Sequence, residues 1–483
     1  MKRLYFIIAV MFMTCAARAQ WEEDVRLTFA NDTSNLSFGM SHNIAASGDT
    51  VHVVWEEQNQ GSSEIYYKRS TDGGLSWDWQ QDTRITYADG YSYYPCVSLS
   101  GPVIHLVWSD TRGGDREIYY NRSIDRGESW EGETRLTNCP SKSYEAVVAA
   151  SGSNVHVVWV NTDLNHFWQI LYKHSPDGGI TWEPEYCLSG SSVGAYNPSI
   201  AVSGSDVYVA WNDKRDGNLE IYYIKSLDNG LIWEPEIRLT DDPADSGLPS
   251  LAVSGSNVSV VWTDSRNGLN EVFYKGSVDG GENWGDDIPL HSDPVFSCYP
   301  NLAVSNSVIH VVWIEFYNIY FSVFYTYSTD GGETWAAKAH LNEYECNTEF
   351  PSMAVAGPLI HVVWKDFRDA NYEIYYKRNP TGGIQVGMED ESLSSSGGRI
   401  SIHPNPANRQ LTVDSWQSTV NSQQSAVRFS IIDLYGREIK EFSNISSFPC
   451  TLDISNLMNG LYILRIINKD GKSGSVKFLK IAE

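Results

Sequence analysis

The sequence lacks any long hydrophobic run after its first twenty residues, so no later segment is expected to cross a membrane as a helix. The first residues differ, because Met-Lys-Arg precedes ten apolar residues and a small-residue Ala-Arg-Ala segment ends at Ala19. This order predicts a removable signal peptide at residues 1–19, and therefore export. Lipid attachment at Cys15 is the alternative, although Thr14 before it suits that modification poorly.

Positive charge is scarce. The chain has 35 Lys and Arg residues against 60 Asp and Glu residues, and its formal net charge is −25. A field of this sign repels nucleic acid and anionic membranes. We therefore expect no nucleic-acid partner and interpret the acidity as that of a soluble surface.

Cysteines are few and are not clustered. Apart from Cys15, the chain contains six of them, and none of their spacings is that of a zinc site. We therefore predict no metal site, and no motif indicates a cofactor. Export permits disulfides, but the sequence leaves their pairing open. The six residues are Cys96, Cys139, Cys187, Cys298, Cys346 and Cys450.

What the chain does contain is a repeat of about fifty residues. A five-residue apolar segment ending in tryptophan, such as "VHVVW", recurs seven times at steps of 51 to 53 residues. In most units a second apolar segment precedes it, and a third, such as "EIYYKRS", and a fourth, such as "EIRLT", follow it. The seven tryptophans are Trp55, Trp108, Trp159, Trp211, Trp262, Trp313 and Trp364.

Each unit therefore predicts four short β-strands separated by turns. The strands are almost continuously apolar, which indicates that both faces of each sheet are covered. The fold class is all-β: a seven-bladed β-propeller over residues 20–383, with six blades as the alternative. The closing strand is expected at Trp21–Thr28, because "WEEDVRLT" resembles "WEPEIRLT" at Trp233–Thr240 and the last unit lacks this piece.

An eight-residue phrase of the form Ser-x-Asp-x-Gly-x-x-Trp stands between the third and fourth strands of six units. Its Asp can accept hydrogen bonds from the backbone just after it, and its Gly can adopt a positive φ. We expect the tryptophan to fold back between blades, with its N–H on a backbone carbonyl. Chemistry needed once would not be copied six times, so the phrase is interpreted as structural.

These six copies resemble the Asp-box, or bacterial neuraminidase repeat, of the sialidase-like propeller superfamily. The resemblance covers residues 21–383 and implies that the boxes lie on the face away from an active site. It also implies, for true sialidases, an Arg-Ile-Pro motif near the start of the propeller, which this chain lacks. The resemblance in fold therefore does not imply sialidase activity. No catalytic residue is identified, and the sequence favours a protein that is not an enzyme.

Residues that recur in every unit are interpreted as architectural. Histidines fill the second position of the tryptophan strand in five units and are expected to pack rather than to bind metal. The loop after that strand repeats Asp-x-Arg in four units, and these arginines either grip carboxylates or sulfates of a ligand or pair with neighbouring aspartates. The arginines are Arg112, Arg215, Arg266 and Arg368, and the histidines are His52, His105, His156, His310 and His361.

Three units depart from the repeat in this loop. Their carboxylates Glu57, Asp163 and Glu315 are the candidates for acid/base work. Their aromatic residues suit stacking on sugar rings, and of these we select Trp168 and Tyr317 as candidate ligand-binding residues, with Phe316 and Tyr320 beside Tyr317. Loops of this kind also vary without any function.

The composition changes after Gly383. Residues 384–399 are a polar Ser- and Gly-rich linker, and residues 400–483 predict a small β-sandwich. This second domain resembles the C-terminal sorting domain of the type IX secretion system of Bacteroidetes-like bacteria; an ordinary sugar-binding sandwich is the alternative. The matching motifs are His403–Ala407, Asp433–Glu438, Asn459–Ile466 and Lys477–Lys480.

Together these features predict an exported protein, secreted or held at the outer-membrane surface, with the type IX secretion machinery as a partner of residues 400–483. The preferred function is a binding or adhesion module for extracellular polymer, either a glycan or a protein ligand. The alternative is a sialidase-like glycoside hydrolase or lyase that acts in the propeller funnel.

Overall fold

The computed structural model is built of strands, with no helix in the parts of the chain that it describes. The described residues are 21–30, 32–37, 42–59, 61–77, 82–87, 89–138, 142–162, 167–190, 194–291, 293–305, 307–342, 344, 346–382, 399–403, 409–417, 427–432, 438–445, 449–457, 460–467 and 473–480. The predicted signal peptide, linker residues 384–398, Asp163 and the tail-motif residues 404–407 and 433–437 lie outside this set. No described helix is long and apolar enough to cross a bilayer.

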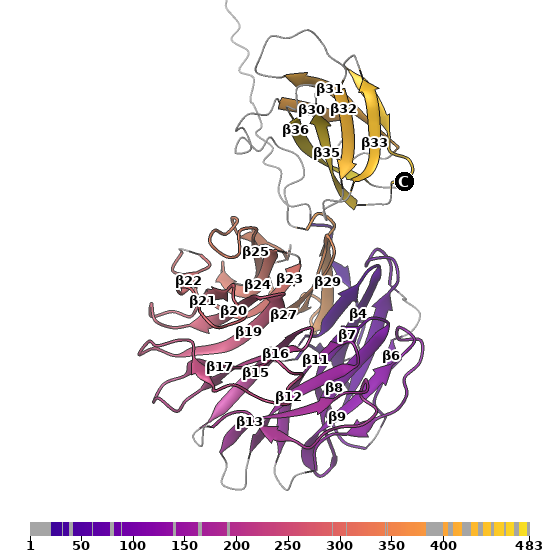
Figure 1. Cartoon of the computed structure of the whole chain (residues 1–483). Helices are drawn as coiled ribbons and strands as arrows, with labels where there is room; N and C mark the ends of the chain where they lie inside the picture. Colours follow the sequence, from indigo (N-terminus) through magenta and orange to yellow (C-terminus); the bar gives the residue numbers. More distant parts are fainter. Residues whose placement is uncertain are drawn as a thin grey trace, which may run out of the picture. The chain divides into compact units, whose positions relative to one another are not determined.

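Residues Trp21–Arg378 form one compact unit of seven antiparallel sheets, which we number as blades 1 to 7 in chain order. Figure 1 shows the blades following one another in sequence colour, and β27 of the last blade contacts β3 of the first. The strands of blades 1 to 3 are β2 (Thr33–Asn35), β3 (Ile44–Ser47), β4 (Thr50–Asn59), β5 (Ser62–Ser70), β6 (Thr83–Arg84), β7 (Ser92–Ser100), β8 (Val103–Gly113), β9 (Asp115–Ser123), β10 (Thr134–Arg135), β11 (Ser143–Ser151), β12 (Asn154–Thr162), β13 (Trp168–Ser175) and β14 (Tyr186–Cys187).

The strands of blades 4 to 7 are β15 (Ala195–Ser203), β16 (Asp206–Asp213), β17 (Glu220–Ser226), β18 (Ile237–Arg238), β19 (Ser246–Ser254), β20 (Asn257–Asp264), β21 (Glu271–Ser277), β22 (Ile288–Pro289), β23 (Ser297–Ser305), β24 (Val308–Tyr317), β25 (Tyr320–Ser328), β26 (Ala339–His340), β27 (Thr348–Ala356), β28 (Leu359–Asp366) and β29 (Glu373–Asn379). In blades 2 to 6 the strand order within the sheet is the order in the chain. The repeat therefore predicts the propeller correctly.

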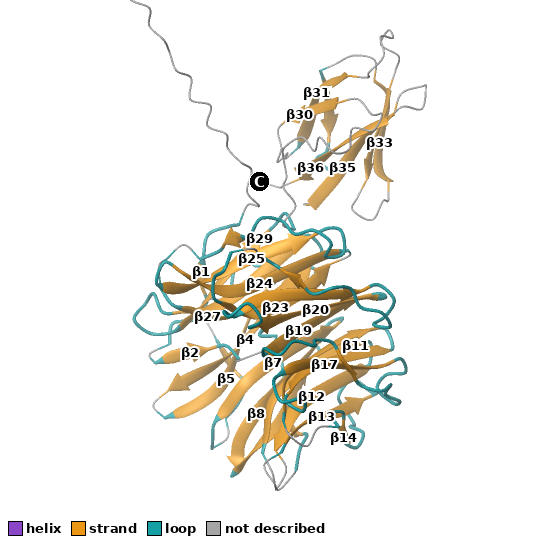
Figure 2. Cartoon of the chain, turned by 90° about the vertical axis from the view of Figure 1, so that its left-hand side faces the viewer, coloured by secondary structure: helices purple, strands orange, loops and turns teal. Residues whose placement is uncertain are grey.

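The ring closes through β1 (Val25–Arg26), which Figure 2 shows beside β29. Val25 pairs with Tyr376 and Arg26 with Tyr375, and the Leu27 amide donates to the Ile374 carbonyl at 2.8 Å. The predicted closing strand is thus confirmed, and it replaces the missing fourth strand of blade 7.

The core lies between neighbouring blades. The seven strand-end tryptophans are all fully buried, with at most 1% of their surface exposed. The five repeat histidines are also buried, and each Nδ1 lies 2.7 to 2.9 Å from a tyrosine hydroxyl on the next strand of its blade. Their packing role is confirmed, and burial lowers their pKa values to about 3 or 4.

The Asp-box is a hydrogen-bonded turn, as expected. In the first copy Asp72 Oδ1 accepts from the Ser76 amide at 2.9 Å, and the Ser70 hydroxyl donates to the same oxygen at 2.8 Å. Gly73 and Gly74 have φ values of 70° and 82°, in the region that glycine tolerates. The turn therefore depends on side chains within eight residues.

The box tryptophans join consecutive blades. Each lies edge-on to a tyrosine of the preceding blade, at centroid distances of 4.8 to 5.2 Å, and Trp21 does the same against Tyr325. The expectation that each indole N–H meets a carbonyl is wrong, because no described acceptor lies within hydrogen-bond distance of these seven nitrogens. The edge-to-face contact, with the positive ring edge on a negative ring face, holds the indole instead.

Residues Asn379–Glu483 belong to a second unit, whose described strands form two antiparallel sheets with a shared apolar core. The sheets have the orders β30-β31-β34 and β33-β32-β35-β36. This is the predicted small sandwich. Its strands are β30 (Arg399–His403), β31 (Gln410–Gln417), β32 (Val427–Ile432), β33 (Glu438–Ile445), β34 (Cys450–Asp453), β35 (Gly460–Ile467) and β36 (Ser473–Lys480).

Candidate functional site

The register of the blades separates two faces of the propeller. In blade 2 the start of the first strand pairs with the end of the second, Ser92 with Asp110, whereas Ser100 pairs with Val103 at the other end. The hairpins between second and third strands therefore lie at the first end, and the boxes lie at the second, where the Arg126 amide donates to the Pro102 carbonyl. We call the end with the hairpins the loop face.

The four Asp-x-Arg arginines are all ion-paired on the loop face. Arg266, for example, lies 2.6 Å from Asp264 and 2.8 Å from Asp287, with Cζ 4.6 Å from the Phe273 ring centroid. Arg112 and Arg215 likewise each contact two carboxylates and a ring, and Arg368 contacts Asp366 and Asp24 at 2.5 and 2.9 Å. Each arginine therefore reaches outward over the third strand, in the arrangement expected if it stiffens its own loop.

The aspartate of this module in blade 5, Asp264, is held ionised. Burial raises the pKa of Asp264, but hydrogen bonds from Arg266 and from the Trp262 indole lower it further, so that the net shift is downward. The Trp262 Nε1 donates to Asp264 Oδ2 at 2.7 Å. Trp, Asp and Arg at alternate positions thus form one local network, which explains why the sequence repeats all three.

Glu57, Glu315 and Tyr317 are variants of the same module. Each glutamate stands where the aspartate stands and accepts from its strand tryptophan at 3.4 Å. Glu315 binds Lys338 at 2.7 Å. Tyr317 stands at the arginine position and packs against Phe324 and His340, as Arg266 packs on Phe273. Glu57 in blade 1, Trp168 in blade 3 and Glu315 in blade 6 are not brought together.

A ring of backbone bulges lies at the loop-face end of the first strands, which contact one another from blade to blade. In six blades the register shifts at the third residue of this strand, and that residue has a φ of 51° to 57° although it is not glycine. Such a backbone costs about 1–2 kcal/mol per residue, and bulges often re-aim a side chain. The residues are Tyr94, Glu145, Asn197, Leu248, Tyr299 and Phe350.

The residues around these bulges in blades 2 to 4 form an aromatic strip. Tyr91 stacks on Tyr93 at 5.8 Å in blade 2, and Trp168 stacks on Tyr144 at 5.4 Å and contacts Tyr196 at 5.2 Å in blades 3 and 4. Arg116 lies in the gap between the two groups, with Cζ 4.8 Å from the ring centroids of both Tyr93 and Tyr144. We define the aromatic strip as Tyr91, Tyr93, Arg116, Tyr144, Trp168 and Tyr196.

A carboxyl group of unusual basicity adjoins the strip. Burial raises the pKa of Glu145 to about 7, whereas a backbone hydrogen bond from Asn197 and the charge of Arg116 lower it. The Asn197 side-chain amide also donates to Glu145 Oε2 at 3.4 Å. On the other side of Arg116, burial likewise raises the pKa of the buried Glu56.

Sequence reasoning found Trp168 but missed Arg116 and Glu145. A signal for Arg116 was present, because the residue that precedes the repeated third-strand glutamate position is different in most blades. The seven residues are Ser63, Arg116, Trp168, Leu219, Asn270, Phe321 and Tyr372. Glu145 had a similar signal, but its neighbours come from other blades and are hidden in the sequence.

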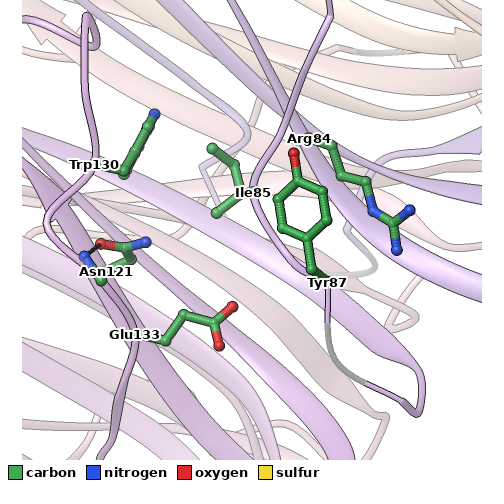
Figure 3. A pocket seen from close by; sticks show the side chains of 7 residues that line it. Arg84, Ile85, Tyr87, Asn121, Trp130 and Glu133 are labelled. Carbon is green, nitrogen blue, oxygen red and sulfur yellow. Dashed lines mark hydrogen bonds between the residues drawn. The ribbon is translucent and has the colours of Figure 1, made fainter.

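Two cavities of the propeller lie elsewhere, at its outer margin. One of about 380 Å³ lies between blades 1 and 2, lined in part by Tyr87, Trp130 and Glu133, as Figure 3 shows. A second, of about 340 Å³, lies at the equivalent place between blades 5 and 6 and includes Lys338. Glu133 is already bound to Arg112, and Lys338 to Glu315. We therefore interpret both as grooves of the blade architecture.

The chemistry available on the loop face is that of stacking and charge. Burial raises the pKa values of Tyr93, Tyr94 and Tyr196, so these phenols are not prepared as bases. No group of three or more metal-ligating side chains occurs among the described residues. The strip can hold apolar ring surfaces and a negatively charged group.

Comparison with family models accounts for both units. A BNR repeat-like domain matches residues 95–311, and a BNR/Asp-box repeat matches residues 326–337. A secretion system C-terminal sorting domain matches residues 401–480. These matches confirm the Asp-box repeats and the sorting domain that the motifs predict. No curated protein matches the chain.

Solved structures resemble this chain at low sequence identity. A polysaccharide lyase, PL25 ulvan lyase bound to -[GlcA(1-4)Rha3S]-, is 12% identical over 73% of this chain and 95% of its own, with a TM-score of 0.51. The Trypanosoma rangeli sialidase is 10% identical over 94% and 89%, with a TM-score of 0.44. Hadza microbial sialidase Hz136 is 15% identical over 58%, with a TM-score of 0.42, and the match spans 64% of its length.

Proposed function

We propose that this chain, an Asp-box repeat propeller with a type IX secretion sorting domain, is an exported binding module for extracellular polysaccharide. The aromatic strip on the loop face is the binding surface. The sorting domain engages the secretion machinery and brings the propeller to the cell surface or the medium, where such polymers occur.

The observation that carries this proposal is the continuity of the strip across three blades. Its rings form two groups with contacts of 5.2 to 5.8 Å, and Arg116 lies against a tyrosine of each group. None of these positions belongs to the repeated box or strand motifs. Aromatic side chains combine apolar area with few rotatable bonds, which makes them effective contacts for ligands. A strip rather than a closed cavity suits an extended polymer.

Binding is favoured over catalysis by the state of the charged groups. The four loop arginines are bound to carboxylates, and Glu57 and Glu315 hold tryptophan N–H groups in separate blades. The alternative, a glycoside hydrolase or lyase, has one supporting observation. A carboxyl group with a pKa of about 7, such as that of Glu145, suits general acid/base work.

The experiment is a binding and turnover assay of the purified full chain against a panel of neutral and acidic polysaccharides. We expect binding without cleavage, and a loss of about tenfold or more in Trp168→Ala, the size typical of a central aromatic contact. Phe367→Ala is the matched control, because Phe367 is an exposed aromatic residue of blade 7 outside the strip. Absence of any binding, or unchanged binding in Trp168→Ala, contradicts the proposal. Chain cleavage that Glu145→Gln abolishes establishes the enzyme instead.

A further inference from the structure

Arg116 differs from the four arginines of the repeated loops in its partners. Each of those forms ion pairs with two carboxylates, whereas the direct contacts of Arg116 are with tyrosine rings. Its Cζ lies 4.8 Å from the centroids of Tyr93 and Tyr144 and 5.8 Å from that of Tyr94. No carboxylate in the described part of the chain forms an ion pair with it.

The stacking prepares the guanidinium for a planar anion. Rings that lie against a guanidinium restrict its rotamers, and its N–H donors remain directed along the edges of its plane. One of these donors interacts with the Tyr94 hydroxyl. A carboxylate or sulfate can accept two parallel hydrogen bonds from such an edge, in the arrangement that makes arginine selective for these groups.

The surroundings make this cation the distinctive feature of the face. The chain carries a net charge of −25, which opposes the approach of an anionic polymer. Lys365, another cation whose charge acts on Glu56, is already bound to Glu349 at 3.0 Å. The carboxyl groups that face Arg116, those of Glu56 and Glu145, are both more basic than usual because they are buried. Neither carboxyl group forms an ion pair with Arg116 in the described part of the chain.

We infer that the ligand of the aromatic strip is an anionic polysaccharide, whose carboxylate or sulfate is bound by Arg116 while adjoining sugar rings contact Tyr144, Trp168 and Tyr196. This inference rests on the proposed binding function and adds two points, the charge of the ligand and the residue that binds the charged group. Arg116 is the residue that determines specificity, and the aromatic residues supply affinity for either a charged or a neutral chain.

The test compares charged polymers with uncharged counterparts of the same backbone, using the purified full chain. The pairs are polygalacturonate with its methyl ester, and dextran sulfate with dextran. We expect at least one charged member to bind tenfold tighter than its neutral partner. Arg116→Gln should abolish that difference, a loss of about 10- to 100-fold for a charge-assisted bidentate contact.

Arg112→Gln is the matched control, because Arg112 lies in the same blade and is already neutralised by Asp110 and Glu133. Arg116→Lys keeps the charge without the planar fork and should retain only part of the difference. Thermal melts show whether each variant is folded. Equal binding of charged and neutral polymers, or unchanged selectivity in Arg116→Gln, overturns the inference. If Trp168→Ala still weakens binding in that case, the binding function itself stands; if no polymer binds, both fail.

Discussion

Asp24→Asn should destabilise the propeller more than the same change at any equivalent position, because Asp24 joins the two ends of the ring. Its carboxylate lies 2.9 Å from both Arg368 and Lys377, and the three side chains are between 4% and 8% exposed. Both cations belong to blade 7, whereas Asp24 directly precedes the closing strand β1. The contact therefore secures a strand with only two register pairs.

The expected loss of stability in Asp24→Asn depends on the partners that Arg368 and Lys377 keep. Removal of one partner of a buried ion pair costs about 3–5 kcal/mol. Arg368 keeps Asp366, and Lys377 keeps the Leu341 carbonyl at 2.8 Å, so the lower end of this range applies. A melting temperature lower by roughly 5 °C is expected for a domain of this size.

Glu236→Gln is the matched control. Glu236 pairs with Arg215 just as Asp24 pairs with Arg368, but within a single blade and with 25% and 22% of the two side chains exposed. An ion pair of this exposure contributes about 0–1 kcal/mol. Thermal melts measure both variants, and hydrogen exchange of the Leu27 amide reports opening of the seam directly. Equal costs for the two variants, or unchanged exchange at Leu27 in Asp24→Asn, refute the claim that the buried contact secures the closure.

Three further outcomes are expected. Gly230→Ala should lower the free energy of unfolding by several kcal/mol, because the added Cβ would lie 1.8 Å from the Tyr172 hydroxyl at a φ of 79°. Gly204→Ala should cost only about 1 kcal/mol, because Gly204 has a similar φ of 63° but faces open space. Similar thermal melts for the two variants would contradict the interblade clash. Acid should destabilise the propeller, because the pKa values of its buried histidines in the folded state lie below the ordinary 6.5. The free energy of unfolding is therefore highest above pH 6.5 and falls as the pH drops towards 4, by roughly 2 kcal/mol per histidine at pH 5. Urea titrations at several pH values check this slope, and His310→Gln should reduce it. Glu145→Gln should stabilise the protein above pH 7 by up to roughly 3 kcal/mol and have little effect below pH 4.5. The unfolded carboxyl group ionises above pH 4.5 while the folded one stays protonated until about pH 7, so the cost of Glu145 builds up between these values and is complete above pH 7. An unchanged melt at pH 8 would show that Glu145 ionises without penalty.

Part of the candidate site was readable from the sequence. Trp168 stands in a loop that departs from the repeat, and the structure places it in the aromatic strip. The sequence also showed the two alternatives for the loop arginines, ligand binding or pairing with a carboxylate, but not which of them applies. The second carboxylate of Arg215 lies twenty-one residues away in the sequence, and that of Arg368 lies at the opposite end of the propeller sequence. Arg116 and Glu145 were not identified, because they acquire meaning only from residues of other blades.

The sequence by itself determined the strands, the turns, the number of blades and the strand that closes them. The strands and turns depend on contacts within one repeat of about fifty residues, such as the hydrogen bonds of Asp72 with Ser70 and Ser76. The closing strand pairs with the far end of the propeller sequence, but its own sequence repeats that of a fourth strand. Only the tertiary structure decided which arginine lacks a carboxylate and which carboxyl group is held near pKa 7. Those properties arise where the first strands of different blades meet at strained bulges. The burial and the electric field of a side chain there depend on residues from several blades, and the sequence does not show which of these residues become neighbours.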